Sequence, residues 1–372
     1  MNGQIPDFRK SKKNFINNDN RLRENAESII ELRKRNGLEN LVGGLQCIII
    51  NTEPELQRPA VAELLRYTGF NYLTGFENDD IRAFILNANQ SADIMITSRK
   101  KAQNNFLPFN QFPKSKKFPN TRLETFVFET KNLYRYTEIQ KSLGVKFLTD
   151  EIVEAEGFLF IQTLPSKFTG NSIGFIEWKG DKGAYSAFKG TKKLDWNFEK
   201  PHRKYLSNIS YLDHAATRVR AEDRDPAIIE FMSMTSYNFK FAIYVEELNS
   251  ITNVARLQGE KFALVFTSGV SPYISDQDSG PTEKYVHNYG PRVHHLAFNT
   301  ENIEYTFEAL RQDGMEFLVN LVGSPEEGLK QTFSVASPNT MIVNEYIHRY
   351  GNFDGFFTRS NVAILTGATG KQ

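Results

Sequence analysis

The feature that most constrains this chain is a fourfold internal repeat. Four segments open with a short strand-like run that ends in a similar polar step, and these runs read LQCIIINT at 45–52, LETFVFET at 123–130, LDHAATRV at 212–219 and VHHLAFNT at 293–300. In three of them a helix-like stretch follows and closes in a glycine turn, at Gly69, Gly144 and Gly314. Glycine suits this place because helices commonly end in a left-handed residue. The remaining segment, EFMSMTSYNFKF, has Ser236, Tyr237 and Asn238 in the turn.

Each turn is followed by further strand-like runs, such as RAFILNA, SADIMITS, GFLFIQT, SIGFIEW, KFALVFT and MIVNEY. Alternating apolar positions and β-branched or aromatic enrichment favour strands in these runs. Each unit is therefore predicted to be β-α-β-β-β. The predicted fold class is α+β, with four such units paired into two domains, each a curved half-open barrel.

Composition excludes several classes of function. The 45 Lys and Arg residues balance 44 Asp and Glu residues to a net charge of +1, which argues against a nucleic-acid binder. No apolar run is long enough for a membrane span, and the basic start lacks the apolar segment of a secretory signal. The single Cys47 rules out a disulfide framework. We expect a cytoplasmic protein without membrane or nucleic-acid partners, and a homo-oligomer formed through exposed strands.

The repeat indicates a metal site in the C-terminal half. Aligning the four opening strands places Cys47, Thr125, His214 and His295 at the same third position. The chain has six histidines, so two of them at one repeat position is an uncommon coincidence. A lone histidine on a strand is more often a hydrogen-bonded structural residue. The neighbouring His294 is an alternative to His295, because adjacent strand residues face opposite ways, and the repeat register favours His295.

The third ligand is predicted to be Glu345, in the final strand TMIVNEYIHR. A carboxylate is rarely buried in such a strand without a partner. Two histidines and one carboxylate with open positions form the facial triad of non-haem Fe(II) oxygenases. Glu177 occupies the matching strand of the second unit, where its partners would be Cys47 and Thr125, so we interpret it as structural.

Four motifs, LDHAATRV, VHHLAFNTENI, EEGLKQTFS and VNEYIHRYGNFDGFF, resemble the 4-hydroxyphenylpyruvate dioxygenase family of the vicinal-oxygen-chelate (glyoxalase/extradiol dioxygenase) superfamily. The resemblance spans about residues 40–362, with its strong motifs in the C-terminal half. It implies that His214, His295 and Glu345 are the ligands of an Fe(II) cofactor. It also implies a set of substrate-binding residues, namely Gln331, Phe333, Ser250, Phe356 and Asn361.

The resemblance implies a dioxygenase that oxidatively decarboxylates an aromatic 2-oxo acid with dioxygen and hydroxylates it. The first candidate reaction converts 4-hydroxyphenylpyruvate to homogentisate, a step of tyrosine catabolism. The chain departs from the family pattern at Thr267, where an Asn is common, at His294, where a Gln is usual, and at Val362, where a Phe is usual. The segment between His295 and Glu345 is also shorter than is usual in the family. Alternatives are the same iron chemistry on another 2-oxo acid, benzylic hydroxylation as in hydroxymandelate synthase, or a non-catalytic binding protein on the same scaffold.

The domain organisation follows from these assignments. Residues 1–38 form a charged N-terminal arm whose basic residues make a solvated face, and residues 39–180 form a non-catalytic paired-unit domain. Residues 181–208 link it to a catalytic metal-binding domain at 209–372 with a C-terminal closing segment. The link overlaps the Gly- and Lys-rich run KGDKGAYSAFKGTKKLD at 179–195.

Overall fold

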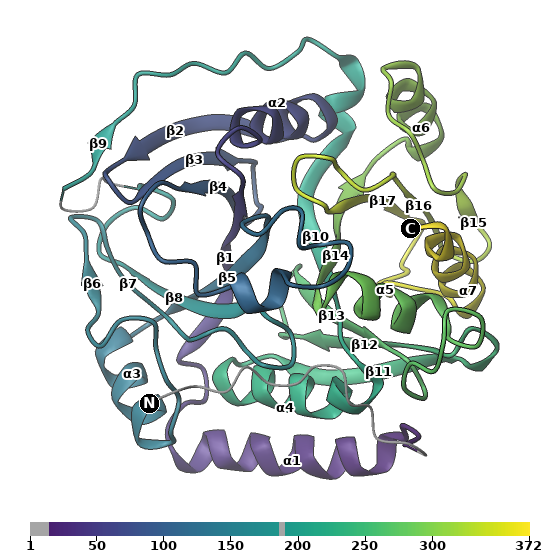
Figure 1. Cartoon of the computed structure of the whole chain (residues 1–372), viewed down its shortest axis with the longest axis horizontal. Coiled ribbons are helices and arrows are strands. Elements are labelled where there is room, and N and C mark those ends of the chain that lie inside the picture. The colour runs from purple at the N-terminus through teal and green to yellow at the C-terminus, as the bar shows by residue number, and fades with distance from the viewer. Residues whose placement is uncertain (1–14, 186–189) are drawn as a thin grey trace.

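The computed structural model describes residues 15–185 and 190–372 and contains two strongly curled sheets side by side (Figure 1). The N-terminal sheet has the strand order β6-β7-β8-β5-β1-β4-β3-β2-β9 among the described residues. Its strands are β1 (Val42–Thr52), β2 (Asn71–Glu77), β3 (Ile81–Asn87), β4 (Asp93–Arg99), β5 (Arg122–Thr130), β6 (Val153–Glu154), β7 (Phe158–Gln162), β8 (Ser172–Trp178) and β9 (Lys192–Lys193).

The C-terminal sheet repeats this plan in the order β11-β12-β13-β10-β14-β17-β16-β15. Its strands are β10 (Ile209–Arg218), β11 (Asn238–Val245), β12 (Ser250–Arg256), β13 (Ala263–Ser268), β14 (Arg292–Thr300), β15 (Val322–Ser324), β16 (Leu329–Phe333) and β17 (Val343–Arg349). The helices are α1 (Asp19–Arg35), α2 (Gln57–Tyr67), α3 (Leu133–Ser142), α4 (Arg224–Met234), α5 (Pro281–Tyr289), α6 (Ile303–Gln312) and α7 (Arg359–Ala368).

The four predicted β-α-β-β-β units are confirmed. Each unit has one helix after its first strand, which is α2, α3, α4 or α6 in chain order. The predicted α+β class and the paired half-open barrels are likewise observed. Helix α5 precedes the fourth unit and α7 follows it, and both lie beside the C-terminal sheet (Figure 1).

The glycine turns are partly as expected. Gly144 and Gly314 have φ of 88° and 94°, as a left-handed helix end requires. Gly69 does not have a positive φ, because α2 ends in an extended Thr68. Glycine is needed there for another reason, since a Cβ at Gly69 would lie 1.8 Å from the backbone oxygen of Ile209. The expectation of a left-handed glycine at this position was therefore wrong.

One continuous apolar core joins the two sheets. It contains α1 residues such as Leu22, strand residues of the N-terminal sheet such as Phe126, and strand residues of the C-terminal sheet such as Leu264 and Tyr346. Helix α1 runs alongside α4 and so packs against the C-terminal half (Figure 1). The two halves are therefore held together by shared packing as well as by the chain.

The basic residues of the N-terminal arm are not all solvated, contrary to expectation. Arg33 is only 7% exposed. Its Nη1 donates to the carbonyl oxygens of Met232, Thr235 and Tyr237 at 3.1, 2.7 and 3.0 Å. These carbonyls lie at the end of α4, where helices leave backbone acceptors without partners. The arm therefore caps α4, while its neighbours Lys34 and Arg35 are exposed as predicted.

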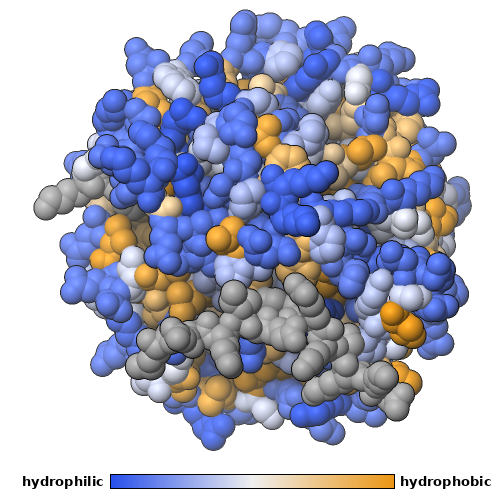
Figure 2. Space-filling view, viewed as in Figure 1, coloured by the Kyte–Doolittle hydropathy of each residue, from blue (hydrophilic) through white to orange (hydrophobic). Residues whose placement is uncertain are grey.

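The link between the sheets adds a strand to the N-terminal one. Within it, β9 pairs with the outer strand β2, with Lys193 opposite Phe76. The visible surface is mainly hydrophilic with small scattered apolar spots (Figure 2). In the described ranges 15–185 and 190–372, no helix has the length and apolar character needed to cross a membrane.

Candidate metal centre

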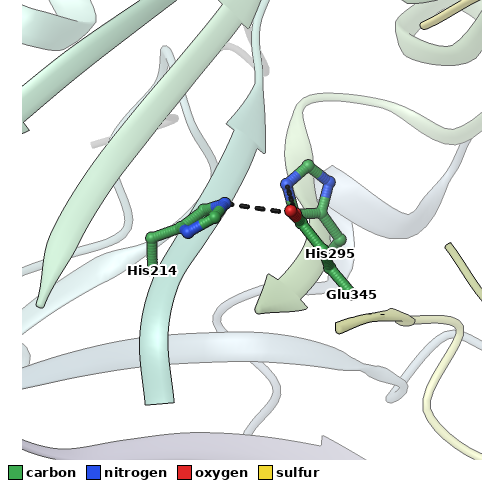
Figure 3. A group of neighbouring side chains, drawn as sticks. All are labelled: His214, His295 and Glu345. Carbon is green, nitrogen blue, oxygen red and sulfur yellow. Dashed lines mark ion pairs between the residues drawn. The ribbon is translucent and has the colours of Figure 1, made fainter. Parts of the chain in front are cut away.

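Three adjacent strands at the centre of the C-terminal sheet bring His214, His295 and Glu345 together (Figure 3). His214 comes from β10, His295 from β14 and Glu345 from β17. The carboxylate Oε2 of Glu345 lies 3.1 Å from Nε2 of His214 and 3.2 Å from Nε2 of His295. One ligand atom from each residue lies within 4.8 Å of the others, and all three residues are buried. The strand register therefore assembles residues that are far apart in sequence.

The three inward atoms fit a metal ion. Nε2 of His214, Nε2 of His295 and Oε2 of Glu345 are buried and, among the described residues, have no hydrogen-bond partner outside the cluster. Buried polar atoms without partners are costly, so such a group is expected to have another partner. Ligand atoms about 2.1 Å from a metal and at right angles to each other are about 3.0 Å apart. The two observed contacts to Glu345 are close to that separation.

His214 is oriented by Asp213. Its Nδ1 lies 2.8 Å from Oδ1 of Asp213, which leaves Nε2 for the metal. Asp213 is itself gripped by Arg349, whose Nη1 and Nη2 donate to its two carboxylate oxygens at 2.6 and 2.9 Å. Burial favours the neutral imidazole, but the carboxylates of Glu345 and Asp213 outweigh it and raise the pKa of His214 to about 9. A metal ion that binds Nε2 of His214 must therefore displace a proton from that nitrogen.

His295 is oriented by His294, which lies in a β-bulge. In the register of β10 and β14, Ala216 pairs with His295 and Thr217 pairs with Val293, so His294 is the extra residue. The expectation that two neighbouring histidines face opposite ways was therefore wrong here. Their Nδ1 atoms lie 2.9 Å apart.

The C-terminal Gln372 fixes the protons of this pair. Its Oε1 lies 2.8 Å from Nε2 of His294, so that nitrogen is the donor. Nδ1 of His294 must then accept from Nδ1–H of His295, which leaves the lone pair on Nε2 of His295 for a metal. Burial, followed by the neighbouring His294, His214 and Arg218, lowers the pKa of His295 well below its usual value. The ring is therefore held in the neutral form that binds metals.

Glu345 is held by a small amide network. Nε2 of Gln331 donates to Oε1 of Glu345 at 2.6 Å and to the backbone oxygen of Phe356 at 2.9 Å. The side-chain oxygen of Gln331 accepts from Nδ2 of Asn361 at 3.1 Å. The structure thus connects three residues singled out by the sequence, Gln331, Phe356 and Asn361, to the carboxylate. In this arrangement Gln331 contacts a ligand directly.

Aromatic rings surround the two histidines. The Phe333 ring is 4.7 Å from the ring of His295, and the rings of Phe356 and Phe357 are 5.6 and 5.4 Å from that of His214. These aromatic side chains are buried and form the apolar part of the surroundings of the cluster. Val362 packs into the same apolar cluster as Phe356 and Phe357.

Ser250 is the predicted site residue with the least direct connection. It begins β12, two strands away from β10, and its hydroxyl lies 3.2 Å from that of Thr282 in α5. Strand alternation places it on the same face of the sheet as His214. No contact joins it to the three ligands within the described residues.

The N-terminal half-barrel lacks this set of ligands. The register of β1 and β5 puts Cys47 and Thr125 at the positions of His214 and His295. The register of β5 and β8 puts Gly174 at the position of Glu345. Glu177 accepts instead from the backbone N–H of Leu133 at 2.7 Å and pairs with Lys179, which fits a structural role.

Three supporting residues were not identified from the sequence. Asp213 directly precedes His214 in the motif LDH, and its acidic side chain in an apolar strand was the available signal. Arg349 follows Glu345 on the same face of β17, where strand periodicity could have indicated it. Gln372 gave no signal, because only the folded chain brings it to His294.

Comparison with solved structures shows a shared fold. A triple mutant of 4-hydroxymandelate synthase from Streptomyces coelicolor matches with a TM-score of 0.65 and 14% identity, over 89% of this chain and 98% of the other. A xylose isomerase-like TIM barrel/4-hydroxyphenylpyruvate dioxygenase fusion protein matches with a TM-score of 0.62 and 13% identity, over 94% of this chain and 58% of the other. No family model and no curated protein matches the sequence. At these identities the likeness establishes the paired half-barrel fold.

Proposed function

We propose that this chain is a non-haem Fe(II)-dependent dioxygenase that oxidatively decarboxylates and hydroxylates an aromatic 2-oxo acid. The proposed substrate is 4-hydroxyphenylpyruvate and the proposed product homogentisate. The observation that carries the proposal is the buried His214, His295 and Glu345 cluster, whose three inward atoms have no other partner. The fold shared with a 4-hydroxymandelate synthase and a dioxygenase fusion protein supports it.

The donor set suits this reaction. His214, His295 and Glu345 would hold Fe(II), which would supply Lewis-acid and redox chemistry for the reaction of a 2-oxo acid with dioxygen. Two neutral imidazoles and one carboxylate leave a divalent ion with a net positive charge, which favours an anionic 2-oxo acid. His214 and His295 present their Nε2 atoms because Asp213 and His294 occupy the opposite ring nitrogens.

The remaining residues shape the space around the metal. Phe333 and Phe356 offer apolar walls beside the two histidines, which suits an aromatic substrate and excludes water. Gln331 keeps one oxygen of Glu345 occupied, so that the other oxygen turns inward. These residues therefore orient the ligands and wall the site, and none of them is needed as a proton donor.

The first experiment is oxygen uptake by the anaerobically Fe(II)-loaded protein with 4-hydroxyphenylpyruvate, with product identification by mass spectrometry and NMR. His214→Ala, His295→Ala and Glu345→Ala should each lose both iron and activity. Glu177→Ala is the matched control, because it removes a carboxylate from the corresponding strand of the other half, and it should keep both. Failure of the wild-type protein to bind iron would overturn the proposal.

A second outcome has specific support. Val362 stands where the resembled family usually has a Phe, and it packs beside Phe356 near His214. Losing an aromatic wall would change where the substrate ring lies relative to the metal. Benzylic hydroxylation, giving 4-hydroxymandelate, is therefore the alternative reaction, and the same product analysis distinguishes it. Iron binding without uptake would direct the assay to other 2-oxo acids. The oligomeric state and the location in the cell stay predictions.

A further inference from the structure

The N-terminal half-barrel encloses a cavity of about 260 Å³ at the place where the C-terminal half has its metal cluster. Cys47 and Thr125, the equivalents of His214 and His295, both line it. The apolar part of the inner wall is formed mainly by Met95, Val127, Phe158, Phe160 and Ile176, and polar side chains such as Asn51, Thr97 and Tyr185 complete it. The strand registers put Cys47, Gly174 and Phe160 at the positions that His214, Glu345 and Gln331 occupy in the C-terminal half. The space is therefore suited to an apolar molecule and not to a metal.

The cavity is reachable from solvent. The loop after β4 contributes Ala102, Gln103 and Asn105, which are partly or largely exposed, whereas Cys47 and Val127 at the opposite end are buried. The loop residues therefore form the mouth and the strand residues form the floor. A ligand can enter beside this loop without separating the strands.

A closed ion pair determines which charge the cavity accepts. Arg99 donates through Nη1 and Nη2 to the two carboxylate oxygens of Glu124 at 2.7 and 2.6 Å. Both side chains line the cavity and are largely buried, at 14% and 6% exposure. An anionic ligand would compete for Arg99 and a cationic one for Glu124, and either would leave one buried charge without its partner. Breaking a buried pair in this way is strongly unfavourable.

The side-chain amide of Gln162 is available for recognition. The hydroxyl of Thr125 donates to Oε1 of Gln162 at 2.9 Å, which leaves the amide nitrogen of Gln162 as a donor at the cavity wall. A hydroxyl or carbonyl oxygen on the ligand would accept from it. The site thus combines apolar and aromatic walls, a neutralised ion pair and an amide donor, as small-molecule pockets generally do.

We propose that this cavity is a second ligand site, which binds an uncharged single-ring aromatic molecule carrying one hydrogen-bond acceptor. The size fits, because an apolar cavity of about 150 Å³ accommodates benzene. The site is separate from the metal centre and does not depend on the proposed dioxygenase activity.

The test uses tryptophan fluorescence of the full chain. Trp178 packs 5.6 Å from Phe158 of the cavity wall, whereas Trp196 stacks on Phe84 elsewhere in the core. In a Trp196→Phe background, Trp178 is therefore a local reporter. Benzyl alcohol is the probe, and benzoate and benzylammonium are its charged counterparts of similar size. We expect a saturable change with benzyl alcohol and affinities more than about tenfold weaker for both ions.

Filling and control variants locate the site. Ile49→Phe narrows the interior and Ala102→Phe narrows the mouth, and each should weaken binding of benzyl alcohol at least tenfold while the protein stays folded by thermal melting. Leu73→Phe, an exposed position on β2 that does not line the cavity, should leave binding unchanged. Glu345→Ala should also leave it unchanged. The proposal would be overturned if benzyl alcohol binding did not saturate, or if the two ions bound as tightly as benzyl alcohol. It would also be overturned if both filling variants bound benzyl alcohol as the wild type does, or if Glu345→Ala lost that binding.

Discussion

Replacing Asp213 by Asn should weaken metal binding without unfolding the protein. Asp213 accepts a hydrogen bond at 2.8 Å from Nδ1 of His214 and two more from Nη1 and Nη2 of Arg349. Its negative charge holds the proton on Nδ1 and keeps the Nε2 lone pair inward. An Asn at this position is neutral, can also present an N–H2 group to the ring, and leaves Arg349 without a charged partner.

The expected size follows from the position of Asp213 behind a ligand. Loss of such a supporting carboxylate typically reduces metal affinity by about 10- to 100-fold. This corresponds to about 1.4–2.8 kcal/mol of binding free energy. The shift should be in metal affinity first, because the ligands His214, His295 and Glu345 are all still present.

The assay is an anaerobic titration with Co(II), followed by its visible absorption, and confirmed with Fe(II) by competition against a chromophoric chelator. Asp313→Asn is the matched control. Asp313 also pairs with arginines, accepting from Arg66 at 2.9 Å and Arg203 at 3.2 Å, but it touches no ligand. A folded Asp213→Asn protein that binds metal within twofold of the wild type would refute the reasoning.

Three further predictions concern the same centre. His294→Ala should weaken metal binding roughly tenfold by freeing the ring of His295, whereas His295→Ala should abolish it; equilibrium dialysis with metal analysis would reveal the reverse order if the register were misassigned. Gln331→Ala should still bind the metal, but with an affinity about tenfold lower, because Glu345 loses the donor at 2.6 Å. An unchanged affinity in the Co(II) titration would contradict this role of Gln331. Because the pKa of His214 is raised to about 9, metal binding at pH 7 should release a proton and strengthen as pH rises toward 9; calorimetry in buffers of different ionisation enthalpy measures that release, and a value of zero would count against it.

The fold was largely predictable because its information is local and repeated. Each unit carries its own periodic strand runs and one helix, so four weak patterns reinforce one another. The repeat alignment makes Cys47 equivalent to His214 and Thr125 equivalent to His295. The strand registers of the two sheets agree with this alignment. What the repeat could not indicate was Gly69, whose role depends on the backbone of Ile209 in the other half.

The sequence could predict the two histidines of the site because they occupy equivalent positions in two repeats. The cluster of His214, His295 and Glu345 follows from strand order, because their strands are neighbours in the sheet. The support of His295 was not predictable, since it depends on an inserted residue. The bulge at His294 turns two neighbouring histidines to one side, against the simple alternation of a strand.

The same bulge occurs in the N-terminal half, so it belongs to the scaffold that the two halves share. In β5 the extra residue is Glu124, at the position of His294, and it faces the cavity and pairs with Arg99. A geometry that presents a side chain inward thus exists in both halves. The two halves differ in what that position carries, an imidazole beside the metal ligands or a carboxylate closed in an ion pair.

A reciprocal contact explains why the N-terminal half matters to the metal centre even without ligands of its own. Arg122 and Arg292 are equivalent residues at the start of β5 and β14, and both are fully buried. Nη2 of Arg122 donates to the backbone oxygen of Pro291 at 3.1 Å, and Nη2 of Arg292 donates to that of Thr121 at 2.7 Å. Each half therefore holds in place the start of a central strand of the other half, β14 or β5. Because β14 carries His294 and His295 two and three residues after Arg292, the position of the second predicted ligand depends on the N-terminal half through Arg122.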